Sequence, residues 1–206
     1  MLASTGLKPG VNKSKAIMNV AIDTQTPTGN RYRIGMLVTL ASIAMLFTSL
    51  SSAYIVRSGL TDWFPIAVPR VMFGSTALLL LASVSIEIAR RKLKQDSSAS
   101  YNRYLSLTVL LGLGFLASQL IAWRQLAQQG LYISTHPHSS FFYLLTGVHG
   151  FHVAGGLLGL GFLWLRSRRY AEEPARRQGM ADAVSIYWHF MFALWIYLFL
   201  LLFLWR

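Results

Sequence analysis

The sequence predicts an all-α integral membrane protein built as a bundle of five transmembrane helices. Its composition, its uncharged stretches and the placement of its basic residues all lead to this fold class. Of the 206 residues, 54% are hydrophobic and 13% are charged, whereas soluble domains average about 25% charged residues. So few charges cannot cover a surface that faces water.

Five long stretches without formal charge account for the five predicted spans. Most of them reach the ~17–25 residues needed to cross ~30 Å of hydrocarbon. The stretches cover residues 34–56, 71–85, 105–123, 141–165 and 184–205. The second becomes long enough if it runs from Pro69 to Ile88, which puts Arg70 and Glu87 at the two interfaces.

The basic residues predict the orientation of these spans. Fifteen of the 19 lie on one face, five in each of three segments: Lys8, Lys13, Lys15, Arg31 and Arg33; Arg90, Arg91, Lys92, Lys94 and Arg103; Arg166, Arg168, Arg169, Arg176 and Arg177. The other face holds Arg57, Arg70, Arg124 and Arg206. Positive residues mark the cytoplasmic side, so we expect the N-terminus inside and the C-terminus outside. Basic loops also suit anionic lipid headgroups, which accounts for the net charge of +12 without nucleic acid.

The chain divides into a polar N-terminal tail and one membrane domain. Residues 1–30 have no apolar core of a signal peptide and are expected to form a cytoplasmic tail. Residues 31–206 form the five-helix domain. Because the sequence contains no cysteine, disulfides, thiolate metal sites and thiol redox chemistry are excluded.

Small residues predict where helices approach closely, since helices in lipid associate through packing. The first span carries a band of small residues, namely Ser42, Ser49, Ser51, Ser52 and Ala53. In the glycine-rich fourth span, Gly155 and Gly159 form a small-xxx-small pair and predict a packing face. At the inner end of the second span, Glu87 stands beside arginines, as an interfacial ion pair or as a point of proton entry.

Histidines are the most informative polar residues within the spans. His149 and His152 stand three positions apart, so they project from one side of the fourth helix, at depths of ~12 and ~16 Å from its outer end. His189, in the fifth span, lies ~7–8 Å from the inner edge. These imidazoles are candidate metal ligands, a candidate proton relay, or hydrogen-bond partners between helices.

Interhelical hydrogen bonding is the favoured role, because a metal site in a bundle needs three or four ligands, commonly with carboxylates. No span has a central Asp or Glu, and we therefore expect no metal or haem on this chain. A neutral imidazole both donates and accepts a hydrogen bond; the candidate partners are Tyr143, Thr146, Ser118 and Gln119. His136 and His138, in the outer loop, are expected to be solvated.

Three segments carry a resemblance to a known family. "MLFTSLSSAYIVRSG" at 45–59, "SSFFYLLTGVHGFHV" at 139–153 and "YWHFMFALWIYLFL" at 187–200 resemble subunit III of haem–copper oxidases. Their order, spacing and topology match the five-helix form of that family from about residue 31 onward.

The resemblance implies a non-catalytic core subunit of a proton-pumping cytochrome c oxidase in the aerobic respiratory chain of a bacterial inner membrane. Haem and copper then belong to partner subunits I and II, while this chain stabilises subunit I and binds phospholipid. The positions carried over are His149, His152, Trp188 and His189. Arg57 is either a ligand of a lipid phosphate or an interfacial anchor.

The sequence departs from the family at three carboxylate positions, which are Ala44, Ala122 and Phe192 here. These departures put a proton-collecting role in doubt but leave packing and lipid binding as expectations. Two alternatives stay open: a subunit III-like partner of a quinol oxidase or nitric oxide reductase, and a free-standing membrane transporter or metal-dependent membrane enzyme that uses the histidines.

Overall fold

The computed structural model describes residues 28–60, 63, 69–95, 97–134, 136–169 and 174–204, so nearly all of the predicted tail lies outside the described residues. Within them are five helices and no strand: α2 (Thr28–Ser58), α3 (Val71–Lys94), α4 (Ser98–Gln128), α5 (Pro137–Arg169) and α6 (Pro174–Leu204). All five are long and apolar enough to cross a membrane. The predicted fold class is therefore confirmed.

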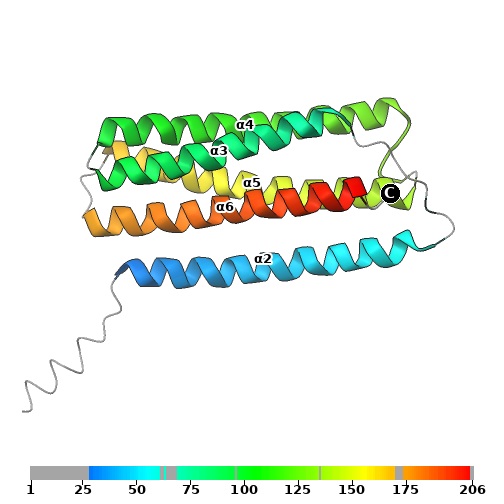
Figure 1. Cartoon of the computed structure of the whole chain (residues 1–206), viewed down its shortest axis with the longest axis horizontal. Coiled ribbons are helices and arrows are strands. Elements are labelled where there is room, and N and C mark those ends of the chain that lie inside the picture. Colours follow the sequence, from blue (N-terminus) through cyan, green and yellow to red (C-terminus); the bar gives the residue numbers. More distant parts are fainter. Residues whose placement is uncertain are drawn as a thin grey trace, which may run out of the picture.

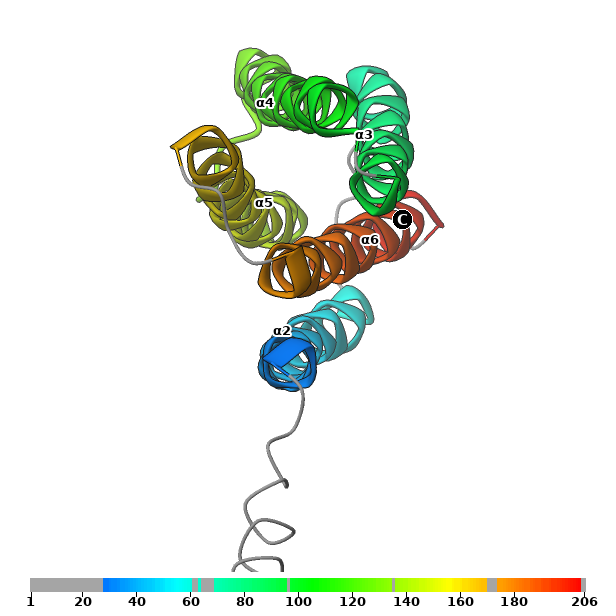
Figure 2. The same cartoon turned by 90° about the vertical axis from the view of Figure 1, so that its left-hand side faces the viewer.

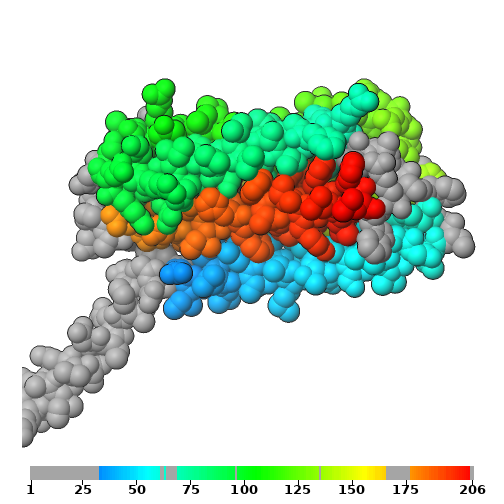
Figure 3. Space-filling view, in the orientation of Figure 1, coloured from blue at the N-terminus to red at the C-terminus, as the bar shows by residue number. Residues whose placement is uncertain are grey.

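Four of the helices form a closed ring, and the fifth lies outside it. Helix α3 packs against α4, α4 against α5, α5 against α6, and α6 back against α3. Figure 1 shows the long helices lying side by side with their axes nearly aligned, and Figure 2 shows the ring end-on. Helix α2 packs along α6, as the space-filling view in Figure 3 also shows, and makes a smaller contact to α5.

Local sequence signals fix the turn between α4 and α5. Gly130 adopts a φ of 77°, a left-handed conformation that glycine reaches without a steric penalty. The N–H of Leu131 then bonds to the carbonyl of Leu126 at 3.1 Å, and that of Gly130 to Ala127 at 3.0 Å, the Schellman pattern that closes a helix. Pro137 occupies the first position of α5, where its missing N–H costs nothing.

The ring is closely packed at glycines other than those predicted. A Cβ added at Gly155 or Gly159 would meet nothing within 4 Å, so the predicted packing face of this pair is wrong. The close approaches are at Gly156 and Gly112, where a Cβ would lie 2.9 and 3.1 Å from the indole of Trp188. Trp188 is fully buried between these two backbone positions.

The small residues of α2 do not form the close helix contact that the sequence predicts. Ser51 is buried, but Ser42, Ser49, Ser52 and Ala53 are exposed. The Ser42 hydroxyl donates to the carbonyl of Val38 on its own helix at 3.1 Å. The band therefore does not form one contact face; α2 instead packs through large side chains, among them the buried Phe47 and Tyr54.

The Gly156–Trp188 contact leads to a prediction with a matched control. We expect Gly156→Ala to lower the free energy of unfolding by about 1–3 kcal/mol, the usual cost of overpacking a core, because the new methyl group meets Tyr187 and Trp188. Gly159→Ala should be neutral or stabilising by up to about 1 kcal/mol, because alanine favours the helix. Unfolding of the purified chain in detergent by denaturant titration measures both. Equal effects of the two substitutions would contradict this packing.

Candidate functional site

His149 lies in the ring interior, enclosed by aromatic side chains from three other helices. Its ring centroid is 6.3 Å from that of Phe47 on α2, 5.7 Å from Phe115 on α4 and 5.1 Å from Trp195 on α6. The side chain is fully buried. Among the described residues, neither ring nitrogen has a hydrogen-bond partner. At this position the imidazole of His149 therefore contributes packing against aromatic side chains.

His152 faces the same side of α5, as the three-residue spacing predicts, because Phe47 also contacts its ring at 5.7 Å. Its Nδ1 lies 2.8 Å from the carbonyl oxygen of Val148, one turn earlier on α5. A carbonyl only accepts a hydrogen bond, so Nδ1 carries the proton. The His152 carbonyl in turn accepts a 2.7 Å hydrogen bond from the hydroxyl of Tyr187 on α6.

None of the four predicted partners bonds to His149 or His152, so that part of the interpretation is wrong: three bond elsewhere, and Gln119 has no partner among the described residues. Thr146 donates to the carbonyl of Phe142 at 2.6 Å and accepts from the indole N–H of Trp123 at 3.1 Å. Tyr143 donates to the backbone carbonyls of Trp123 and Leu131, at and just beyond the C-terminal end of α4. Ser118 donates to its own helix at Phe115. Gln119 is buried, and its amide has no partner among the described residues.

His189 belongs to a polar cluster between α3 and α6. Its Nδ1 lies 2.6 Å from the hydroxyl of Ser83, and its Nε2 lies 3.7 Å from a carboxylate oxygen of Glu87, with 44% of the imidazole exposed. The predicted ion pair of Glu87 is confirmed, because Arg90 and Arg91 both donate to its carboxylate. Sequence reasoning missed the approach of Glu87 to His189, although both were expected near the inner end of their spans.

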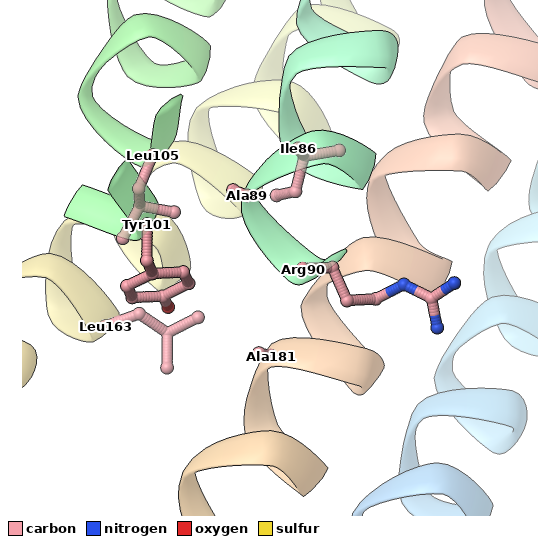
Figure 4. A pocket seen from close by; sticks show the side chains of 7 residues that line it. All are labelled: Ile86, Ala89, Arg90, Tyr101, Leu105, Leu163 and Ala181. Carbon is pink, nitrogen blue, oxygen red and sulfur yellow. The ribbon is translucent and has the colours of Figure 1, made fainter. Parts of the chain in front are cut away.

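Arg90 extends this cluster across the helix boundary. Its guanidinium donates to Asp182 on α6 at 3.1 Å, which sequence analysis did not identify as a partner. Nearby, the ring encloses a cavity of about 10 Å³ lined by residues of all four ring helices, which is close to the lower limit for one water molecule. Figure 4 shows the guanidinium of Arg90 directed away from Tyr101, which also lines the cavity.

His138 is not the solvated loop residue that the sequence predicts. It is the second residue of α5 and is fully buried. Its Nε2 lies 3.3 Å from the hydroxyl of Tyr54 on α2, and its ring stacks on Trp63 with centroids 4.6 Å apart. His138 thus links the C-terminal end of α2 to the N-terminal end of α5, while His136, just before the helix, is half-buried.

Trp188 and Arg57 are the remaining residues that the sequence singled out. Trp188 is the buried centre of the ring contacts described above, and Arg57 lies in the last turn of α2. In the part of the chain that the structure describes, no three His, Cys, Asp or Glu side chains are grouped so that they could hold a metal ion. The geometry brings His149 and His152 together around Phe47 and places His189 in a separate cluster with Glu87.

Two neighbouring arginines that pair with Glu87 are expected to differ in their contribution to stability. Arg90 pairs with both α3 and α6, whereas Arg91 pairs with Glu87 on its own helix. We expect Arg90→Ala to lower the free energy of unfolding by up to about 1 kcal/mol, the upper range for a partly exposed ion pair. Arg91→Ala should cost about 0.3 kcal/mol, the value of an exposed intrahelical pair. Denaturant titration at low salt measures the difference; a larger effect of Arg91→Ala would refute the bridging role.

Comparison with known proteins identifies the family. A family model described as cytochrome c oxidase subunit III matches residues 19–206. The probable cytochrome c oxidase subunit 3 of Nocardia farcinica is 32% identical over 180 residues, which cover 82% of this chain and 86% of that protein. Cytochrome c oxidase subunit 3 of Thermostichus vulcanus is 32% identical, covering 83% and 86%, and that of Bacillus sp. PS3 is 30% identical, covering 87% and 88%. Together with the five apolar helices, these matches show that the chain belongs to the cytochrome c oxidase subunit III family and is a subunit of a membrane oxidoreductase complex.

Proposed function

We propose that this chain is the non-catalytic core subunit of a proton-pumping cytochrome c oxidase, stabilising catalytic subunit I and binding phospholipid. Haem and copper then reside on subunits I and II, where electron transfer to oxygen takes place. The membrane is the inner membrane of a bacterium, with the N-terminus of the chain in the cytoplasm.

The observation that carries this proposal is the environment of His149. An imidazole that relays protons or binds a metal needs access to water or to further ligands. His149 is instead enclosed by Phe47, Phe115 and Trp195. Its burial among aromatic rings supports a role in holding the helices of the bundle together.

The outer face of α2 supports the assignment of a partner subunit. Met45, Val56 and Val38 are 74%, 72% and 63% exposed, and α2 contacts the rest of the chain mainly along α6. Such a face is suited to lipid or to another membrane subunit.

Co-purification tests the proposed assembly. When the chain is isolated from gently solubilised native membranes, we expect haem and copper absorbance to accompany it in a stable ratio, because those centres belong to its partner subunits. An optical spectrum with mass spectrometry of the associated chains provides the measurement and identifies the electron-accepting subunit. Recovery of a colourless, monodisperse assembly of this chain alone would refute the proposal.

Substitutions at His149 distinguish a packing role of this side chain from a role in proton transfer or metal binding. We expect His149→Ala to destabilise the chain by about 2 kcal/mol or more, because it opens a cavity among the aromatic rings. His149→Leu keeps much of the volume and should leave assembly and oxygen consumption near their original values, because the imidazole has no described hydrogen-bond partner to lose. Oxygen consumption and recovery of the complex are measured together. Loss of turnover in an intact complex carrying His149→Leu would instead indicate a proton or metal role.

A further inference from the structure

A groove of about 370 Å³ opens on the outside of the ring at the outer end of α4 and α5. Its walls come from the last turns of α4, from the connection that follows, and from the second turn of α5. The lining residues are Leu120, Trp123, Arg124, Ala127, Tyr132, Ile133 and Tyr143. Leu120 and Ile133 are 54% and 62% exposed, so the groove presents apolar surface to its surroundings.

The polar groups of the deeper wall are satisfied within the protein. The indole N–H of Trp123 donates to Thr146 at 3.1 Å, and the hydroxyl of Tyr143 donates to the carbonyls of Leu131 at 2.9 Å and Trp123 at 3.3 Å. These bonds hold the two aromatic side chains in place and leave their apolar faces toward the groove. The wall is therefore rigid and suited to a hydrocarbon chain.

Arg124 supplies a positive charge at this apolar wall. It is exposed, and none of the described carboxylates pairs with it. The described carboxylates are Glu87 and Asp182, and both are engaged with Arg90 near the opposite end of the bundle. Arg124 stands four residues before the end of α4 at Gln128, about 6 Å along the axis, which is the depth of the headgroup region for a helix that crosses the bilayer.

We propose that this groove binds one phospholipid with an anionic headgroup, its phosphodiester held by Arg124 and an acyl chain lying against Leu120, Trp123 and Tyr143. A guanidinium pairs with phosphate through two parallel hydrogen bonds, and the aromatic belt of a membrane protein lies at the same depth. The charge selects an anionic over a zwitterionic lipid, whose own cation competes for the phosphate. The inference deepens the proposed lipid-binding role, because it names a site and a headgroup class.

The test uses the full chain, or the complex that contains it, reconstituted in an equal mixture of phosphatidylglycerol and phosphatidylcholine and then re-solubilised. Bound lipid is quantified by native mass spectrometry and by analysis of the extracted lipid. We expect phosphatidylglycerol to be retained in preference. Arg124→Gln should reduce that retention about fivefold, the effect of one basic residue near an anionic surface. Arg70→Gln removes an exposed arginine of the same predicted face outside the groove and should leave retention unchanged.

Two further variants test separately the apolar wall of the groove and the positive charge of Arg124. Leu120→Trp should expel the lipid with Arg124 intact, because it fills the groove, and Arg124→Lys should preserve part of the preference. Excess inorganic phosphate should not displace the lipid, because a free ion lacks the acyl chain. Equal retention of the two lipids, unchanged retention in Arg124→Gln, or a partner helix seated in the groove of the complex would overturn the proposal.

The outcome is separable from that of the proposed oxidase role. Lipid retention is measured on this chain whether or not partner subunits are present. Absence of haem and copper in the co-purification would refute the oxidase assembly and leave the lipid result standing. Loss of the lipid preference with an intact, coloured complex would refute the groove alone.

Discussion

The ring of α3 to α6 depends on one large side chain packed against two positions without a Cβ. In lipid the hydrophobic effect does not drive helices together, so close packing must hold them. The indole of Trp188 on α6 lies against Gly112 on α4 and Gly156 on α5, so one side chain connects three of the four ring helices. The neighbouring Tyr187 adds a hydrogen bond to the backbone of His152 on α5.

The ring of helices is closed by the contact between α3 and α6, which are far apart in the sequence. This contact depends on polar side chains. Polar contacts join the two helices along their length: the indole of Trp195 donates to Thr76 at 3.0 Å, His189 lies against Ser83 and Glu87, and Arg90 pairs with Asp182. Each contact gives a polar side chain a partner within the protein, which matters where lipid offers none. Together they fix the register of the two helices.

The membrane helices could be predicted from the sequence because run length and charge are local properties. The 71–85 stretch illustrates the limit, since α3 extends to Lys94 through charged residues that lie at the membrane surface. The ion pair of Glu87 with its neighbouring arginines was predictable from helical spacing. Its approach to His189 was not, because it depends on which faces of α3 and α6 meet.

The burial of His138 and the glycines used for packing could not be predicted either, because both depend on which helix faces meet. His138 looks like a loop residue, yet Tyr54 and Trp63 cover it, and neither is near it in the sequence. Gly155 and Gly156 are adjacent on one helix, and a large side chain of α6 stands opposite Gly156 alone. Spacing within one helix identifies a small residue but not the neighbour that needs the space.

The three apolar residues at which the resemblance led us to expect carboxylates bear on the role of the histidines. Ala122 is fully buried, and Ala44 and Phe192 are half-buried, so apolar side chains stand at the positions where the resemblance led us to expect acids. The carboxylates among the described residues are at the Arg90 cluster, while His149 is separated from solvent by Phe47, Phe115 and Trp195. Aromatic rings from α2, α4 and α6 therefore cover His149 on three sides. The same rings pack α5 against α2, α4 and α6, which is the contribution that the proposed scaffold role requires of them.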